Sequence, residues 1–362
     1  MFDLLAQEQV RDVHFKYDPA SGLRAIIAIH STKFGPALGG CRFISYDSED
    51  RALNDALRLA RGMSYKAVLA KIPQGGGKSV ILKPASYDPE KLFLAFGDFV
   101  NELGGRYITA IDSGTSAAEM DIIARRTRHV TSTSYETNPS DFTAEGVFAG
   151  ITVACQQVLA NESLTGVHVA LQGLGNVGFQ LAQRLRKAGA TLTVADIDEN
   201  RVRQAVDQLG AQAVSADKIY AVDCDVFSPC GLGGVINDQT LPQLKCKMIA
   251  GSANNQLLTE EHGKLLHQRN ILYAPDYVIN AGGLIYASMH HNGFDNHDIA
   301  HKSQEISVTL AEIFNASKAQ EKPTSVIADT LAEARLFGLS NSENKRRSQG
   351  VDFSRRSGGE VA

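Results

Sequence analysis

Along the chain, short apolar runs alternate with longer segments in which apolar residues recur at helical spacing. Runs rich in β-branched and aromatic residues predict strands over residues 23–29, 79–82, 107–111 and 129–133. Apolar residues on one helical face predict helices over 49–70 and over 88–103, the second with Asp88 as its N-cap. Residues 1–142 are therefore expected to form an α/β domain.

From about residue 143 the pattern changes to a long apolar helix followed by strands and helices in regular alternation. Such alternation is typical of a parallel sheet with helices on both faces, so residues 143–320 are predicted to form a second, doubly wound domain. A further helix is expected within residues 321–340. Residues 341–362 are polar, basic and contain glycine and serine, which predicts a disordered tail.

Composition narrows the class of protein. The 362 residues are 43% apolar and 21% charged, and a formal net charge of −4 gives no reason to expect a nucleic-acid surface. The five cysteines are widely spaced without a C-x-x-C pair, which suits a reduced cytoplasmic protein without disulfides or a zinc site. The N-terminal residues lack the features of a signal peptide, and no apolar stretch of about 18 residues predicts a membrane span.

The most informative segment is VHVALQGLGNVGFQLAQRLRKAGATLTVADID, residues 167–198, where a strand, a glycine-rich turn, an amphipathic helix and a second strand follow in order. The glycines permit a tight turn, close approach to a pyrophosphate and close packing of the helix, whose N-terminal N–H groups face the anion. The residues expected to contact a dinucleotide here are Gly173, Gly175, Asn176, Val177 and Gly178. Asp196, after the second strand, is suited to bind ribose hydroxyls and to repel a 2′-phosphate, so NAD is predicted over NADP. Glycines at this spacing also occur where helices only pack closely, but the ordered elements and the acid favour the dinucleotide site.

A second glycine-rich stretch, AKIPQGGGKSVIL at residues 70–82, looks like the end of a P-loop. That motif requires a glycine where Ile72 stands, so Lys78 is not expected to bind ATP. Lys78 is placed in a glycine loop, Lys66 near the end of the preceding helix, and Asp112 after the strand 107–111. Each alone is explained as well by a solvated lysine or a helix cap. Together they suit chemistry on an amino acid, with one lysine to bind a carboxylate, one of lowered pKa to act on water or a carbonyl, and an acid to move protons.

These motifs, with several others, make the sequence resemble the amino-acid dehydrogenases of the glutamate/leucine/phenylalanine/valine family, and most of all its leucine dehydrogenases. The resemblance extends from about residue 5 to residue 338. It rests on the stretches GPALGGCRF (35–43), LARGMSYKAVLAKIPQGGGKSVI (59–81), YITAIDSGTS (107–116), GLGNVG (173–178), IAGSANNQL (249–257) and APDYVINAGGLI (274–285).

The resemblance implies an N-terminal domain for substrate binding and oligomerisation, an NAD domain, a cleft between them, and a C-terminal helix packed back toward the N-terminal domain. Lys78 and Asp112 match the family's catalytic lysine and proton-moving acid, and Lys66 matches the lysine that binds the substrate α-carboxylate. Further substrate-binding positions implied by the resemblance are Leu38, Gly39, Gly40, Ala110, Asn280 and Ile306. Thr143 and Asn255 match positions at the nicotinamide end of the cofactor. The implied reaction is the reversible, NAD-dependent oxidative deamination of leucine, valine or isoleucine to a 2-oxo acid and ammonium by a homo-oligomer.

The sequence also departs from the family pattern. Tyr286 stands where asparagine is frequent, Asp141 where leucine dehydrogenases usually have proline, and Ser303 where an aliphatic residue is usual. The last of these leaves open the same reaction on phenylalanine or another aromatic amino acid. Adjacent His290 and His291 do not predict a metal, because neighbouring helical residues face different ways and no acid or cysteine completes a ligand set.

A non-catalytic NAD-binding sensor is the alternative from another functional class. Cofactor binding alone would not require Lys66, Lys78 and Asp112, so their presence together favours an enzyme.

Overall fold

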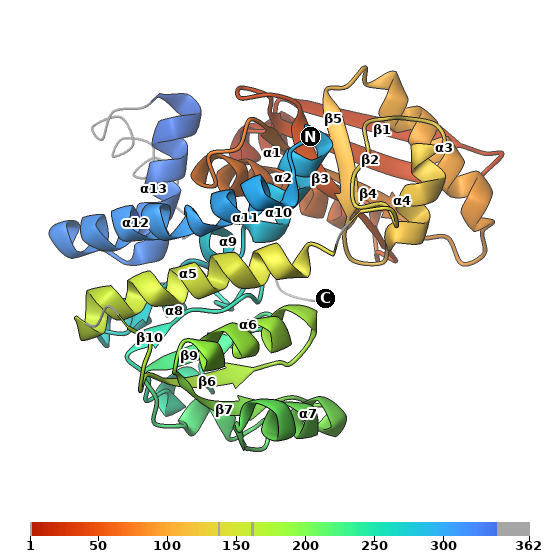
Figure 1. Ribbon diagram of the computed structural model, residues 1–362. Helices are drawn as coiled ribbons and strands as arrows, with labels where there is room; N and C mark the ends of the chain where they lie inside the picture. The colour runs from red at the N-terminus through yellow and green to blue at the C-terminus, as the bar shows by residue number, and fades with distance from the viewer. Residues whose placement is uncertain (1, 137, 161–162, 339–362) are drawn as a thin grey trace, which may run out of the picture.

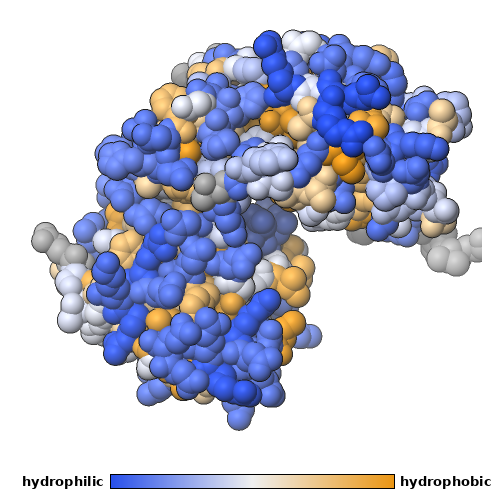
Figure 2. All heavy atoms as spheres, turned by 45° about the vertical axis from the view of Figure 1, so that its right-hand side comes forward, coloured by the Kyte–Doolittle hydropathy of each residue, from blue (hydrophilic) through white to orange (hydrophobic). Residues whose placement is uncertain are grey.

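The computed structural model describes residues 2–136, 138–160 and 163–338, which form two α/β domains as the sequence predicts (Figure 1). The space-filling view shows two lobes with a hollow between them on one face (Figure 2). The limits of each domain, drawn from the sequence at residues 142 and 320, remain a prediction.

The N-terminal domain is built on a mixed five-stranded sheet of order β1-β2-β4-β3-β5. Its strands are β1 (Asp12–Asp18), β2 (Leu23–Ser31), β3 (Ala37–Ile44), β4 (Gly75–Leu82) and β5 (Tyr107–Ile111), and its helices are α1 (Phe2–Glu8), α2 (Glu49–Leu69), α3 (Pro89–Glu102) and α4 (Ala117–Ala124). β3 runs parallel to β4 and β5, whereas β2 is antiparallel to β1 and β4. Asp88 caps α3 as predicted, with its carboxylate accepting from the N–H groups of Glu90 and Lys91.

Alternation along the strands gives this sheet two different faces. Ala37, Cys41 and Phe43 of β3 pack into a core with α3 and α4. Leu38, from the same strand, belongs instead to the large apolar cluster that continues into the second domain. The face that carries Leu38 is therefore the one that meets the second domain.

Two predictions about this domain are wrong. Lys78 lies within strand β4, not in a loop, because the preceding glycines continue the strand to Gly75. Glycine at position 76 allows α2 to lie directly on the strand, since a Cβ there would come 2.0 Å from the backbone nitrogen of Ser64. The strand expected over 129–133 is reduced to a single bridge between Thr109 and Val130.

The second domain contains a parallel sheet of order β11-β10-β9-β6-β7-β8. This is the strand order of the dinucleotide-binding fold, with β6 as its first strand and a reversal of order between β6 and β9. Its strands are β6 (His168–Gln172), β7 (Thr191–Ala195), β8 (Gln212–Ala213), β9 (Val226–Pro229), β10 (Met248–Ile249) and β11 (Leu272–Tyr273), accompanied by α6 (Asn176–Lys187), α7 (Glu199–Leu209), α8 (Glu260–Gln268) and the short turns η1 (Ile219–Ala221) and η2 (Leu241–Gln243).

Helices complete the molecule around α5 (Ser140–Leu159), which begins slightly before the predicted position. They are α9 (Asp276–Ile279), α10 (Gly282–His291), α11 (Asn296–Gln304), α12 (Ile306–Gln320) and α13 (Thr324–Phe337). Within the described ranges, α5 alone is long and apolar enough to cross a membrane. It is a core helix here, since Ile279 and Leu310 pack so closely on it that a Cβ at Gly150 would come 2.6 Å from Ile279 and 2.8 Å from Leu310.

The C-terminal helix α13 contacts the N-terminal domain. Lys33 donates to the last carbonyls of α13, at 3.0 Å from Arg335 and 2.8 Å from Leu336, and the Tyr65 hydroxyl of α2 donates to Glu333 at 2.7 Å. The tail predicted to be disordered, residues 341–362, lies outside the described residues.

Candidate active site

Lys78 and Asp112 meet above strand β3 of the N-terminal sheet. Lys78 is on β4 and Asp112 follows β5, so the two residues flank β3. The Nζ atom of Lys78 lies 2.8 Å from Oδ2 of Asp112. At Gly40 of β3 a Cβ would come 2.7 Å from the Cβ of Asp112 and 3.3 Å from Lys78 Nζ, so glycine provides the space in which the pair forms.

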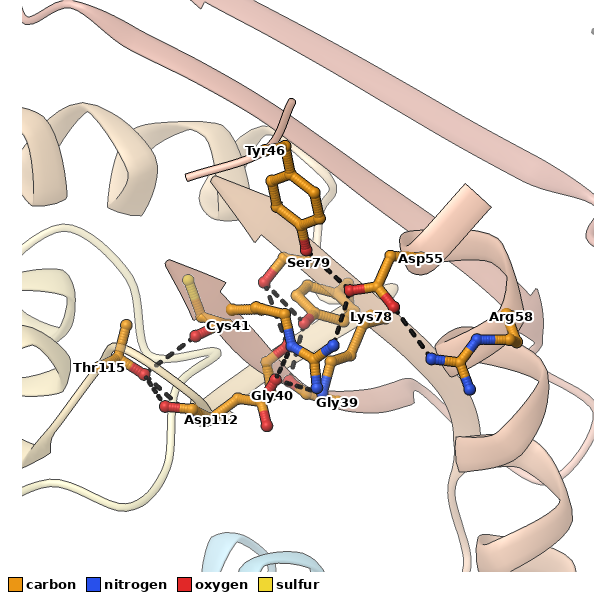
Figure 3. A network of polar contacts seen from close by, with 12 residues as sticks. Gly39, Gly40, Cys41, Tyr46, Asp55, Arg58, Lys78, Ser79, Asp112 and Thr115 are labelled. Carbon is orange, nitrogen blue, oxygen red and sulfur yellow. Dashed lines mark hydrogen bonds and ion pairs between the residues drawn. The ribbon is translucent and has the colours of Figure 1, made fainter. Parts of the chain in front are cut away.

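Neighbouring polar groups hold this arrangement in place (Figure 3). The Thr115 hydroxyl accepts from the Asp112 N–H at 3.0 Å and donates to the carbonyl of Cys41 at 2.9 Å. The Tyr107 hydroxyl donates to the carbonyl of Gly39 at 2.7 Å. Thr115 thus ties the loop after β5 to β3, and Tyr107 ties the start of β5 to the same strand.

Burial and charge set the ionisation of the pair. Lys78 is 5% exposed, and desolvation lowers its pKa against the opposing attraction of Asp112. For Asp112, desolvation acts to raise the pKa, but the charges of Lys78 and Arg42 outweigh it and hold the pKa below its ordinary value. The site therefore contains a lysine whose neutral form is made accessible and a carboxylate that stays ionised.

Lys66 reaches from α2 to the second domain. Its Nζ donates to Oδ1 of Asn280 at 2.6 Å, and the Asn280 amide donates to the carbonyl of Ser252 at 3.1 Å and to Oδ1 of Asn254 at 2.7 Å. Desolvation lowers the pKa of Lys66 to about 8, opposed by Asp276 and assisted by Lys78. Two lysines thus lie in one partly enclosed region, where the positive charge of Lys78 helps to lower the pKa of Lys66.

Asp276 anchors the loop that supplies these partners. Its carboxylate accepts from the N–H groups of Gln256 at 3.1 Å and Tyr277 at 2.8 Å. Desolvation raises the pKa of Asp276, while these backbone donors and the charge of Lys66 oppose the rise. This buried carboxylate therefore positions the loop beside Lys66.

The predicted glycine turn follows β6 as expected. Gly173 has φ +94°, and a Cβ at Gly178 would come 2.0 Å from the carbonyl oxygen of Gly173, so both positions require glycine. Gly175 caps α6 without a side-chain hydrogen bond, and the nearest atom to a Cβ there, on Arg201, would be 3.9 Å away. The N–H groups of Asn176 and Val177 are thus presented at an open helix N-terminus, as a pyrophosphate requires.

Comparison with known proteins identifies the family. The family profile for the Glu/Leu/Phe/Val dehydrogenase dimerisation domain matches residues 7–129, and that for Glutamate/Leucine/Phenylalanine/Valine dehydrogenase matches residues 194–334. The chain belongs to this dehydrogenase family. It is therefore an amino-acid dehydrogenase, which removes the sensor alternative.

Individual relatives agree with this assignment over nearly their whole length. The dehydrogenase is 48% identical to a leucine dehydrogenase of Geobacillus stearothermophilus over 93% of each chain, and 42% identical to a phenylalanine dehydrogenase of Caldalkalibacillus thermarum over 92% of this chain and 93% of the other. The crystal structure of L-tryptophan dehydrogenase from Nostoc punctiforme matches with a TM-score of 0.87 at 39% identity, covering 96% of this chain and 100% of that chain. Amino-acid dehydrogenases of this family are NAD-dependent, in keeping with the open glycine turn.

The remaining residues predicted to contact the cofactor lie in three different parts of the structure. They are Asp196, Thr143 and Asn255. Asp196 directly follows β7 beside the glycine turn, and its carboxylate accepts from the N–H groups of Leu174 at 2.5 Å and Asp198 at 2.8 Å. Thr143 lies in the first turn of α5, where its hydroxyl donates to the carbonyl of Pro139 at 3.3 Å. Asn255 is exposed at φ 51°, and its neighbour Asn254 makes the side-chain contact with Asn280.

The residues expected at the substrate side chain come from both domains. Leu38 and Ala110 are on the same sheet face, since Leu38 pairs with Ile108 and Gly40 with Ala110. Ile306, 3% exposed, begins α12 and belongs to the same apolar cluster as Leu38, with its Cδ1 directed at Gly146 of α5.

The three departures from the family pattern are accommodated by packing and pairing. Ser303 is fully buried with its hydroxyl donating to the carbonyl of Ile299 at 2.9 Å, and Asp141 pairs with Arg184 at 2.6 Å. Tyr286 is stacked between Phe142 and His290, with ring centroids 5.1 and 5.2 Å away.

Within the described part of the chain, one group of possible metal ligands comes together, formed by Asp295, His297 and Asp298. All three residues are exposed, and the carboxylate of Asp295 caps α11.

Sequence reasoning missed Arg42, Asn254 and the anchoring role of Asp276. Arg42 stands two positions after Gly40, so strand alternation places it on the face of Gly40, but only the pairing of β3 with β4 puts Lys78 on that face too. Asn254 and Asn255 are adjacent asparagines, and nothing local distinguishes which one turns toward Asn280.

Proposed function

We propose that this dehydrogenase catalyses the reversible NAD-dependent oxidative deamination of an aliphatic L-amino acid, namely leucine, valine or isoleucine, to its 2-oxo acid and ammonium. The observation that carries the proposal is the Lys78–Asp112 pair, buried above Gly40 next to apolar side chains and within reach of a second lysine. NAD binding at the glycine turn is part of the proposal.

Lys66 binds the α-carboxylate of the substrate. Its ammonium group contacts Asn280, a neutral partner, so its charge is left available to an incoming anion. Asn280, held by Ser252 and Asn254, orients the same end of the amino acid.

Lys78 and Asp112 carry out the proton transfers. NAD, when bound, would supply the hydride acceptor for Cα. Asp112, ionised in the free enzyme, takes a proton from the substrate ammonium, so that loss of the hydride leaves an iminium. Lys78 in its neutral form takes a proton from water as the water oxygen adds to the iminium carbon. Asp112 then returns its proton to the amino nitrogen, and the C–N bond breaks as the hydroxyl proton leaves to complete ammonium; the proton on Lys78 is released to solvent. The sum converts amino acid, NAD⁺ and water to 2-oxo acid, NADH, ammonium and one proton.

The side-chain pocket determines which amino acid is used. Leu38 and Ala110 offer no cation to a distal carboxylate, and burying such a charge unpaired costs several kcal/mol. An apolar pocket distinguishes neighbouring aliphatic chains by only about 1–3 kcal/mol per methylene. Leucine, valine and isoleucine are therefore expected as substrates together, with glutamate excluded.

An aromatic substrate is the second candidate, because relatives of similar identity are phenylalanine and tryptophan dehydrogenases. Ser303 was the residue expected to make room for an aromatic ring, but its buried hydroxyl is bonded within α11. This favours the aliphatic assignment.

We further propose that the protein is a cytoplasmic homo-oligomer assembled through the N-terminal domain, whose profile is named for dimerisation.

A substrate panel tests the assignment. The ratio kcat/KM is measured for leucine, valine, isoleucine, phenylalanine, tryptophan and glutamate with NAD under one set of conditions. The aliphatic amino acids should exceed the aromatic ones, and glutamate should be lowest. A preference for phenylalanine or tryptophan would assign an aromatic substrate, and a preference for glutamate would contradict the account of the pocket.

A further inference from the structure

A second cation shares the carboxylate oxygen that Lys78 contacts. Nε of Arg42 lies 3.0 Å from Oδ2 of Asp112, the same atom that lies 2.8 Å from Lys78 Nζ. Arg42 is on β3, two residues after Gly40, so its backbone belongs to an inner strand that is paired with β4 and β5 on its two sides. Asp112 is therefore held from β4 and from β3 at once.

Arg42 is itself fixed from α2. Its NH1 atom lies 2.6 Å from Oδ2 of Asp55, which also accepts from the Tyr46 hydroxyl at 2.7 Å, while Arg58 contacts Oδ1 of Asp55 at 3.1 Å (Figure 3). The side chains of Arg42 and Asp55 are 19% and 16% exposed, so solvent screens this pair less than a surface ion pair. One guanidinium thus bridges two carboxylates, with different nitrogen atoms toward each.

We propose that Arg42 is a positioning residue of the active site, which holds the Asp112 carboxylate beside Lys78 and is held in turn by Asp55. The inference rests on the proposed function of Asp112. Arg42 does not touch the substrate in this account and acts only through Asp112 and Lys78.

The chemistry of arginine suits this task. Its guanidinium stays protonated throughout the working pH range and presents donors in a fixed planar fork, so it supplies a constant charge and a defined direction. It cannot compete with Asp112 for the proton moved in the reaction. A lysine at the same position could keep the charge but would reach the two carboxylates less well.

Substitutions at Arg42 and at Asp55 are expected to shift the pH profile of kcat/KM in opposite directions. Asp112 forms ion pairs with Lys78 of β4 and Arg42 of β3. Arg42 also pairs with Asp55 of α2, which in turn pairs with Arg58. The carboxylate of Glu119 in α4 accepts from the Ser116 hydroxyl.

The Arg42 charge lowers the pKa of both Asp112 and Lys78, and Lys78 must be neutral to take a proton from water. Removing that charge therefore raises the pKa of both groups and moves the acid limb of kcat/KM to higher pH. Asp55→Asn keeps an oxygen that accepts from Arg42 but removes the charge that compensates it, which lowers the pKa of both groups and moves the limb to lower pH.

The experiment compares Arg42→Met, Arg42→Lys and Asp55→Asn with the unaltered enzyme, in profiles of kcat/KM against pH for its best amino acid. Arg42→Met should lower kcat/KM about 10²-fold and raise the acid limb by about one pH unit. Arg42→Lys should restore the limb but only part of the rate, and Asp55→Asn should move the limb the other way. Arg51→Gln is the matched control, since Arg51 of α2 is 71% exposed and pairs with Asp47 at 2.5 Å rather than with Asp55; its rate should change less than about twofold.

NAD dissociation constants and thermal midpoints accompany each profile, because a purely structural role would change stability without moving the acid limb. The inference is overturned if Arg42→Met keeps the normal limb, or if Asp55→Asn moves it in the same direction as Arg42→Met. Should Arg42→Met fail to fold, Arg42→Lys and Asp55→Asn decide by the same criteria. An unaltered enzyme without activity on any amino acid would instead refute the proposed function.

Discussion

Lys78 and Asp112 lie 2.8 Å apart across strand β3, and the pair exists because residue 40 between them has no side chain. Charge partners on non-adjacent strands of a sheet are normally separated by the side chains of the strand between them. Here the absence of a side chain at residue 40 leaves space for a small polar site on the sheet face that also carries Leu38 and Arg42.

Lys78→Ala should abolish turnover while leaving NAD binding intact, because the lysine and the glycine turn lie in different domains. General acid–base and electrostatic assistance of this kind contributes about 10²–10⁴-fold in rate. Single-turnover rates and an NAD titration separate the two effects. Asp112→Asn should behave alike, since an amide cannot take up the proton. Lys91→Ala, at an exposed position of α3, should leave turnover unchanged. Near-normal turnover in Lys78→Ala would falsify the catalytic assignment.

Gly40→Ala should separate the pair without removing either charge. The added methyl would overlap Asp112 and crowd Lys78, so kcat/KM should fall by at least about tenfold while both residues remain present. The control is Gly62→Ala, at an exposed helical glycine with no atom within 4 Å of the added Cβ, which should raise stability by about 0.5–1 kcal/mol and leave activity unchanged. A fully active Gly40→Ala enzyme would show that the pair can form elsewhere.

Binding of the substrate carboxylate should weaken above about pH 8. The free enzyme's Lys66 has its pKa lowered to about 8, so its ammonium is present below that pH and is lost as the pH rises. The dissociation constant of the 2-oxo acid of leucine, whose carboxylate does not titrate in this range, is measured by calorimetry from pH 7 to 10. It should rise about tenfold per unit well above pH 8, with proton uptake on binding.

The same titration has an internal control. Asp276 raises the pKa of Lys66 by its charge, so Asp276→Asn should move the break to lower pH. Lys66→Met should weaken binding and remove the break altogether. Affinity that is independent of pH in the unaltered enzyme would exclude Lys66 as the carboxylate ligand.

Asp196 should determine the choice of cofactor. Its carboxylate is fixed at the end of β7 by two backbone N–H groups and would meet a 2′-phosphate as a like charge. The ratio of kcat/KM for NAD to that for NADP should be high and should fall in Asp196→Ser, whereas Asp207→Ser, on exposed α7, should leave it unchanged. Arg201, which points toward the turn at Gly175, is the residue that would favour NADP if the unaltered enzyme used both cofactors equally.

The sequence by itself determined the features that depend on neighbouring residues. Period and capping placed α2 and α3, with Asp88 at the start of the latter, and the glycine spacing after β6 was sufficient to locate the dinucleotide turn. Such features follow from the backbone geometry of short segments, which a local pattern of side chains encodes directly.

Tertiary structure alone decided which chemical groups meet. The glycines before Lys78 looked like a loop because glycine usually interrupts a strand, and only the close approach of α2 at Gly76 explains why they belong to one. The contacts of Lys78 with Asp112, of Arg42 with Asp55 and of Lys66 with Asn280 join residues far apart in sequence. These encounters depend on strand order and on the docking of two domains, and no periodicity within a segment carries that information.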